Sequence, residues 1–196
     1  MTRIVAGLTR TSQVLAWIGG ALILCSAVLI SLDVVVRALF RSTLFESFEL
    51  SGYAFAIATS LGLAYTLITK GHIRIEVLYN ALGLRLRAAL DLVALLALSV
   101  VSTVWGYWCL QTVLQNLAMG ARSNSSLAAP LALPQSLWWL GIAWLAIVSW
   151  VLTACAVVWM AQRRVSELHR TLGVGSLQEE ISANVDLPAA TASGAR

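Results

Sequence analysis

The chain has 196 residues, of which 59% are hydrophobic and 11% are charged, and its mean hydropathy is +0.83. A soluble domain carries about 25% charged residues, so this composition excludes an ordinary soluble protein and predicts an integral membrane protein. The net charge of +4 does not indicate a nucleic-acid partner, because the positions of the cations along the chain are explained by membrane topology.

Four apolar stretches are long enough to cross a bilayer as helices, which takes about 20 residues each. We expect an all-α integral membrane protein with four transmembrane helices, at about 14–36, 50–69, 92–114 and 135–160. These spans form a membrane domain at 14–162, between an N-terminal segment at 1–13 and a tail at 163–196. The tail is rich in Ala, Ser and Gly and lacks a sustained apolar face, which is typical of a disordered segment.

The first apolar run follows Arg3 and Arg10, an arrangement that signal peptides share. The run from Thr11 to Leu32 is longer than the apolar core of a typical signal peptide, and further spans follow it. We therefore expect it to be retained as the first transmembrane helix.

Cytoplasmic segments of membrane proteins carry an excess of Lys and Arg. One side of the predicted membrane holds the larger group: Arg3, Arg10, Lys70, Arg74, Arg85, Arg87, Arg163, Arg164 and Arg170. The other side holds Arg37, Arg41 and Arg122. This distribution predicts that both termini are cytoplasmic and that the loops at 33–49 and 117–134 face outward.

Small residues recur every four positions in the second span. They would lie on two adjacent helix faces, with Gly52, Ala56, Ser60 and Ala64 on one and Ala54, Ala58 and Gly62 on the other. Small residues allow helix backbones to approach closely inside a membrane. The pattern predicts a tightly packed seam within the bundle or at a subunit interface, although Ala and Gly are also simply common in membrane helices.

The loop after the second span alternates charged and apolar residues through His72, Arg74 and Glu76, and apolar positions then follow helical spacing with Arg85 and Arg87 on the polar side. This pattern predicts a short interfacial amphipathic helix in the cytoplasmic loop. We hypothesise that His72, Arg74 and Glu76 fix a cytoplasmic turn in which Arg87 is available to pair. Contact of these cations with phospholipid headgroups is the alternative.

Asp33 and Arg37 are four residues apart, so they would share one helix face and can form an ion pair. Ionisable residues inside a membrane are costly and often functional. Asp33 lies near the outer end of its span, however, where Arg37 or water can satisfy it. We predict structural pairing, with an ion or proton site as the alternative; no other charge lies inside a predicted span.

The sequence offers little for catalysis or for holding a cofactor. Cys25, Cys109 and Cys155 lie apart in apolar runs, which indicates packing residues rather than disulfides or metal ligands. The only histidines, His72 and His169, lie outside the spans and could not hold haem between helices. We therefore expect no enzyme, no resident cofactor and no metal site in this chain.

Several short motifs occur in a characteristic order. They are Asp33-x-x-x-Arg37-x-x-Phe40, Glu49-Leu50, Leu61-Gly62-Leu63-Ala64, Gly71-His72-Ile73-x-Ile75-Glu76, and the basic pair Arg85 and Arg87. In this order and spacing the chain resembles, over about residues 14–160, the small membrane subunit of tripartite ATP-independent periplasmic (TRAP) transporters, the DctQ-like family. It departs from the family pattern at Phe45, where Trp is frequent, and at Glu76, where Asp is usual.

The resemblance implies a multi-pass protein of the bacterial inner membrane that works with two partners. A periplasmic substrate-binding protein would capture a small organic acid, and a large membrane subunit would carry the substrate and sodium sites and move as an elevator. The small subunit would act as a static scaffold and help to dock the binding protein. We hypothesise that Arg37, Arg41, Glu46 and Glu49 form an outward-facing polar patch near these partners, ordinary solvated loop charge being the alternative.

Two other functions remain open at this stage. The chain could be a self-contained, homo-oligomeric small transporter or channel, for which only Asp33 could line a polar path within the spans. It could also be the anchor subunit of a membrane enzyme, which the lack of histidines inside the spans disfavours.

Overall fold

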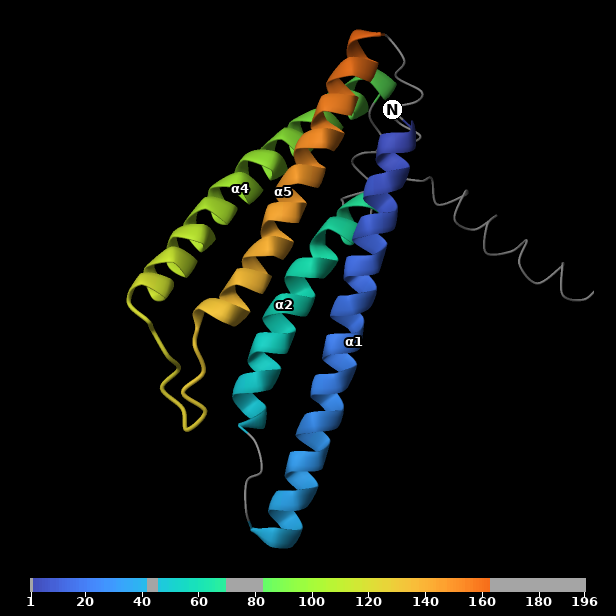
Figure 1. Cartoon of the computed structure of the whole chain (residues 1–196). Helices are drawn as coiled ribbons and strands as arrows, with labels where there is room; N and C mark the ends of the chain where they lie inside the picture. The colour runs from blue at the N-terminus through green and yellow to red at the C-terminus, as the bar shows by residue number, and fades with distance from the viewer. Residues whose placement is uncertain (1, 42–45, 70–82, 163–196) are drawn as a thin grey trace, which may run out of the picture. The chain divides into compact units, whose positions relative to one another are not determined.

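The computed structural model describes residues 2–41, 46–69 and 83–162 (Figure 1). Four helices make up this part of the chain: α1 (Thr2–Phe40), α2 (Ser47–Ile68), α4 (Leu84–Ala118) and α5 (Ala132–Ala161). All four are long and apolar enough to cross a membrane. The expected all-α architecture with four membrane helices is confirmed. The predicted tail and most of the predicted amphipathic helix lie outside the described residues.

α1, α4 and α5 extend beyond the expected spans at both ends, whereas α2 begins before its expected span of 50–69 and ends at Ile68. α1 has 39 residues and α4 has 35, so at about 1.5 Å per residue each is longer than the roughly 30 Å hydrocarbon core of a bilayer. α2, with 22 residues, is close to the length that a span needs. Helices of such unequal length cross one bilayer by tilting or by projecting from it.

α1 and α2 form an antiparallel hairpin whose backbones touch near the middle (Figure 1). Gly19 faces α2 so closely that a Cβ there would lie 2.9 Å from the carbonyl oxygen of Ala58. Only glycine fits at this contact without moving one of the helices. The predicted close packing of the second span therefore occurs here, through Ala58 of α2.

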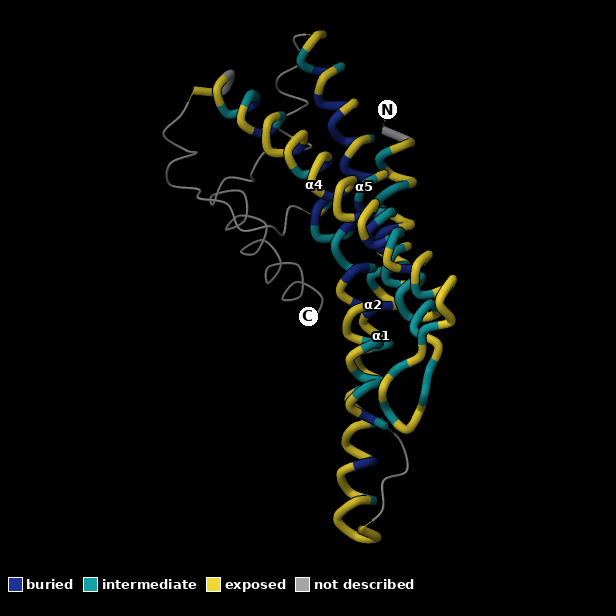
Figure 2. Tube along the Cα trace, turned by 90° about the vertical axis from the view of Figure 1, so that its left-hand side faces the viewer, coloured by how far each residue is buried: buried dark blue, intermediate teal, exposed yellow. Residues whose placement is uncertain are grey.

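α5 is the helix most enclosed by the others. About half of its most apolar stretch is buried, whereas almost none of the corresponding stretch of α1 is (Figure 2). Gly141 packs against Ser60 of α2, and the indole Nε1 of Trp144 donates a hydrogen bond of 2.9 Å to Ser12 of α1. Several buried hydrophobic side chains of the core lie on this helix, among them Ile142, Leu145, Val148 and Leu152.

Polar contacts join α4 to α5 at several levels. Hydroxyl groups meet at Ser99 with Thr153 (3.0 Å) and at Ser102 with Ser149 (3.3 Å), all of them buried. Buried polar groups need such partners because hydrocarbon supplies none. Ser and Thr side chains thus connect the two helices at membrane depth.

Three tryptophans of α5 donate their indole N–H groups to partners inside the chain. Trp139 donates to the carbonyl of Gly106 (3.0 Å) and Trp150 donates to Thr103 (2.9 Å). The depth of Trp144 and Trp150 in the sequence predicts contacts with another protein. Both also make an intrachain hydrogen bond, and Trp150 remains 45% exposed. Contact of these side chains with a partner stays a prediction.

A second compact unit contains one end of α4 and one end of α5, at residues 83–92 and 156–162 of the described chain. Ala88, Asp91 and Trp159 are buried in it. The first compact unit contains residues 1–72 and 93–155, and the candidate site lies within it.

Candidate functional site

Asp33 holds together the end of α1 and the start of α2. Its carboxylate Oδ2 accepts a hydrogen bond of 2.7 Å from Arg37 Nη2 and another of 2.7 Å from the hydroxyl of Ser47. The carboxylate is buried, whereas the Arg37 side chain is 57% exposed. The predicted pair of Asp33 and Arg37 therefore forms, and it leaves much of the guanidinium accessible.

Ser47 is a partner that the sequence analysis missed. It is the first residue of α2 and is itself buried, because its hydroxyl points at the Asp33 carboxylate of the preceding helix. A hydroxyl residue at a helix start usually indicates a local cap. Here the serine at the helix start contacts Asp33 on another helix, and the spacing of residues around Ser47 does not predict that contact.

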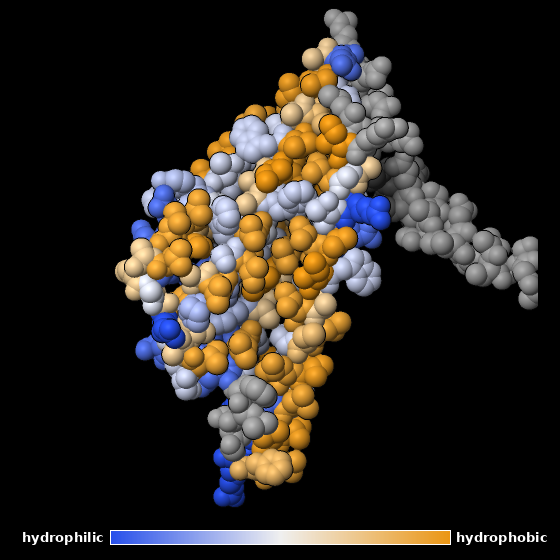
Figure 3. Space-filling view, in the orientation of Figure 1, coloured by the Kyte–Doolittle hydropathy of each residue, from blue (hydrophilic) through white to orange (hydrophobic). Residues whose placement is uncertain are grey.

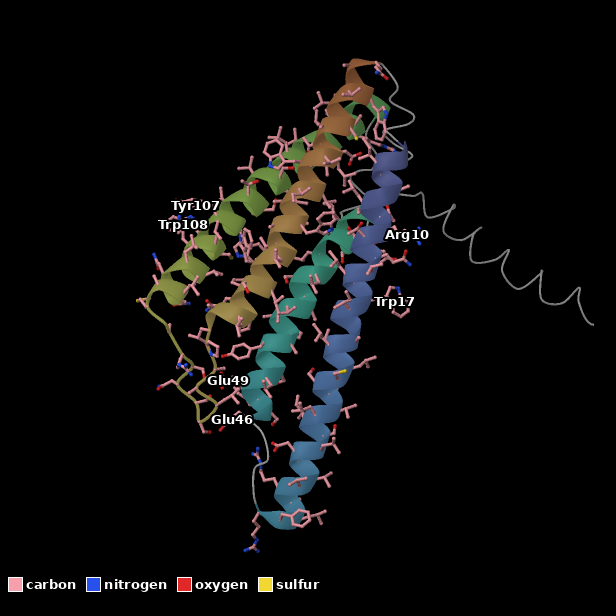
Figure 4. All side chains as sticks on the ribbon, in the orientation of Figure 1. Arg10, Trp17, Glu46, Glu49, Tyr107 and Trp108 are labelled. Carbon is pink, nitrogen blue, oxygen red and sulfur yellow. The ribbon has the colours of Figure 1, made fainter. Side chains whose placement is uncertain are left out.

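Two further carboxylates at the start of α2 bind the loop between α4 and α5 (Figure 4). Glu46 accepts a hydrogen bond from the hydroxyl of Ser126, and Glu49 accepts one from Ser125. The hydroxyl of Tyr53, one turn along α2, also donates to Glu49. We call Glu46, Glu49, Ser125 and Ser126 the carboxylate–serine latch, since its contacts join segments 76 and 80 positions apart.

The loop that the latch holds, residues 119–131, has an ordered backbone. An isolated bridge pairs Arg122 with Pro130, and the N–H of Ser123 donates to the carbonyl of Ala129 at 2.8 Å. Gly120, in the turn that follows α4, has a φ of +58°, and Ala128 takes up a left-handed φ of 44°. A non-glycine residue with positive φ is uncommon and persists where surrounding contacts hold it.

The small residues of α2 divide into two groups. Ala58, Ser60 and Ala64 are buried inside the chain, against α1 and α5 in the first two cases. Gly52 and Ala56 are exposed, and Gly62 is half-buried; a Cβ added at Gly52 or Gly62 would touch nothing. Phe48 and Phe55, 91% and 64% exposed, lie near Gly52 on the same helix. We call Phe48, Gly52, Phe55 and Ala56 the open α2 face.

The chain matches one known protein family. A family model described as "Tripartite ATP-independent periplasmic transporters, DctQ component" matches residues 26–164. The chain belongs to this family. It is a small membrane subunit of a TRAP transporter. No curated protein and no solved structure matches it.

The matched region of this DctQ component contains the whole candidate site. It runs from the second half of α1 through the latch and the α4–α5 loop to the end of α5. Arg41, the remaining member of the predicted polar patch, is exposed directly after α1 and has a φ of 51°. Glu46 and Glu49 thus both bind serines of the same loop, and Arg37 forms an ion pair with Asp33.

Other predicted residues of the DctQ component are only partly described. His72, Arg74 and Glu76 lie outside the described residues, as does the side chain of Arg85, and Arg87 is half-buried. The cytoplasmic turn and the phospholipid contact therefore stay predictions. Among the residues that the structure does describe, no group of three His, Cys, Asp or Glu side chains could hold a metal ion. The hydrogen bonds of the site join the end of α1, the start of α2 and the α4–α5 loop to one another.

Proposed function

We propose that this chain is the small membrane subunit of a sodium-coupled, binding-protein-dependent transporter for organic acids in the bacterial inner membrane. In this proposal it scaffolds a large elevator-type subunit, which holds the substrate and sodium, and helps to dock the periplasmic binding protein. Both termini would be cytoplasmic. Membership of a family whose members are components of tripartite transporters supports this proposal, as does the lack of charged residues in the spans apart from Asp33.

The open α2 face is the main structural support for the proposed scaffold role. It combines two small residues with two exposed phenylalanines, and a Cβ added at Gly52 would meet no atom of the described residues within 4 Å. Small residues permit close helix contact in membranes, where association depends on packing rather than on the hydrophobic effect. The apolar surface of α1 is also largely uncovered (Figure 3). These surfaces fit a subunit that packs beside a larger membrane protein.

Substitution at Gly52 tests the scaffold role without disturbing the chain itself. A Cβ added at this exposed position meets no atom of the described residues within 4 Å, so Gly52→Leu should fold and insert normally. If the open α2 face contacts the large subunit, the added side chain should block that contact and strongly reduce the amount of large subunit that co-purifies. Gly7→Leu is the matched control, because Gly7 is exposed on α1 with equally open surroundings and precedes the predicted first span.

Wild-type recovery of the large subunit with both Gly52→Leu and Ala56→Leu would show that this face is covered by lipid, and the scaffold role would need another surface. Transport of substrate by the chain alone in liposomes would contradict the proposed function as a whole.

A further inference from the structure

The packing of α1 fixes which side of this helix faces away from the bundle. Ser12 accepts a hydrogen bond of 2.9 Å from the indole of Trp144, and Gly19 packs against the backbone of Ala58. Ser12 and Gly19 are both buried. They are seven residues apart, which is close to two full turns, so they lie on the same side of the helix. The opposite side of α1 therefore faces the surroundings of the bundle.

Three residues with the same spacing of seven line this opposite side. Arg10 and Trp17 each precede a bundle-facing residue by two positions, which is a rotation of about 200°, and Leu24 continues their line. All three are exposed, Trp17 by 75% and Leu24 by 70%. Figure 4 shows Arg10 and Trp17 on the same side of α1, pointing away from the other helices. We call Arg10, Trp17 and Leu24 the α1 strip.

The polar groups of the α1 strip have no partner among the residues that the structure describes. Neither the guanidinium of Arg10 nor the indole N–H of Trp17 makes a hydrogen bond or an ion pair there. The indoles of Trp139, Trp144 and Trp150, by contrast, all donate within the chain. A polar group left without a partner in hydrocarbon is costly. Both groups therefore need a polar partner from outside the described chain.

The chemistry along the α1 strip changes in the same order as the chemistry along a phospholipid molecule. Its members follow one another at about 10 Å along the helix axis, so a cation, an indole and an aliphatic side chain together cover about 20 Å. Cations near the membrane surface attract anionic headgroups, and indole rings favour the level at which headgroups meet hydrocarbon. No such order is required of a protein partner, so the match favours a lipid.

We propose that the α1 strip binds an anionic phospholipid. The phosphate of this lipid pairs with Arg10, its ester carbonyls accept the hydrogen bond of the Trp17 indole, and its acyl chains pack against Leu24. With Arg10 near the predicted cytoplasmic end of the first span, the lipid belongs to the inner leaflet. The inference concerns a ligand of α1 and does not depend on the proposed function. It is also separate from the lipid contact that the sequence predicts for the loop after α2.

Lipid titration tests the contribution of the charge. The full-length chain, purified with any membrane subunit that accompanies it, is titrated in detergent with phosphatidylglycerol or with phosphatidylcholine of the same acyl chains, and native mass spectrometry counts the bound lipids. Arg10→Gln should weaken the binding of phosphatidylglycerol about 5-fold and leave the binding of phosphatidylcholine unchanged. Arg10→Lys keeps the charge and should retain most of the preference. Arg122→Gln, which removes the same charge from an exposed loop position, is the matched control and should change neither affinity.

Two further variants test the indole and the identity of the occupant. Trp17→Ala should weaken the binding of both lipids several-fold, because both carry ester carbonyls, and Trp17→Phe, which keeps a ring but not the N–H, should lose less. Gln13 is exposed between Arg10 and Trp17. A photoreactive benzophenone side chain in place of Gln13 should therefore crosslink to phospholipid when native membranes are illuminated.

Three results would overturn the proposal. The first is an unchanged affinity of Arg10→Gln for phosphatidylglycerol. The second is crosslinking of position 13 to protein rather than to lipid, which would assign this side of α1 to a partner subunit and leave the proposed function intact. The third is displacement of phosphatidylglycerol by glycerol phosphate, which has no acyl chains, because the site would then bind a free anion. Absence of a large subunit from the purified material would contradict the proposed function and leave the lipid titration unaffected.

Discussion

Gly141 is the position at which one added methyl group should most clearly disturb the bundle. A Cβ built there collides with the hydroxyl oxygen of Ser60 and lies 2.7 Å from both the carbonyl carbon and the Cβ of that residue. The hydroxyl can rotate away, but the carbonyl carbon belongs to the backbone of α2. Reaching a normal carbon–carbon distance of about 3.5 Å requires α2 and α5 to separate by about 0.8 Å.

The expected loss of folding stability follows from a comparison of two alanine variants, Gly141→Ala and Gly62→Ala. Overpacking of this kind costs about 1–3 kcal/mol, while replacing a helical glycine by alanine gains up to about 1 kcal/mol. Gly62→Ala receives the same gain without the clash, because a Cβ at Gly62 touches nothing. The free energies of unfolding of Gly141→Ala and Gly62→Ala should therefore differ by about 1–3 kcal/mol, with Gly141→Ala the less stable.

Reversible unfolding in mixed micelles, followed by tryptophan fluorescence as denaturing detergent increases, measures this difference. Gly19→Ala should behave like Gly141→Ala, since its Cβ would lie 2.9 Å from the Ala58 carbonyl oxygen. Equal stability of the Gly141→Ala and Gly62→Ala variants would refute the packing of α2 against α5 described here.

Three further predictions concern single contacts. Ser47→Ala should lower the free energy of unfolding by about 1–3 kcal/mol, because it removes a hydrogen bond to the buried Asp33 carboxylate; Ser51→Ala, whose hydroxyl bonds only its own helix in an exposed position, should be near neutral in the same assay. The double variant Arg41→Glu, Glu49→Arg, which reverses both charges, should reduce substrate uptake while surface labelling shows normal insertion. Unchanged uptake would contradict the hypothesis that Arg37, Arg41, Glu46 and Glu49 form an outward-facing polar patch. Trp150→Phe should cost less than about 1 kcal/mol of stability, since its partly exposed indole makes one neutral hydrogen bond; a larger loss would show that Trp150 has a packing role.

Contacts between residues close in the sequence could be predicted, and those between distant segments could not. The four spans follow from hydropathy, and the pair of Asp33 and Arg37 follows from the geometry of one helical turn. The contact of Glu49 with Ser125 joins positions 76 apart, so no periodicity reveals it. It depends on how α4 and α5 turn back toward the start of α2.

The small residues of the second span show a second feature that the sequence alone could not predict. Spacing assigns them to two helix faces but does not give the rotation of the helix about its axis. That rotation depends on Gly141 and Gly19, which are on other helices and admit Ser60 and Ala58 to the interior. Gly52 and Ala56 stay outside as a result.

The central claim is that this chain is a subunit that works beside a large membrane protein. Purification of the tagged chain from its native membrane, with quantification of every co-purifying membrane protein, tests it most directly. We expect one large, multi-spanning subunit to co-purify in fixed proportion, and Gly52→Leu to reduce this proportion. Purification of the wild-type chain as a homo-oligomer, with no second membrane protein, would show that the chain does not work beside a large subunit.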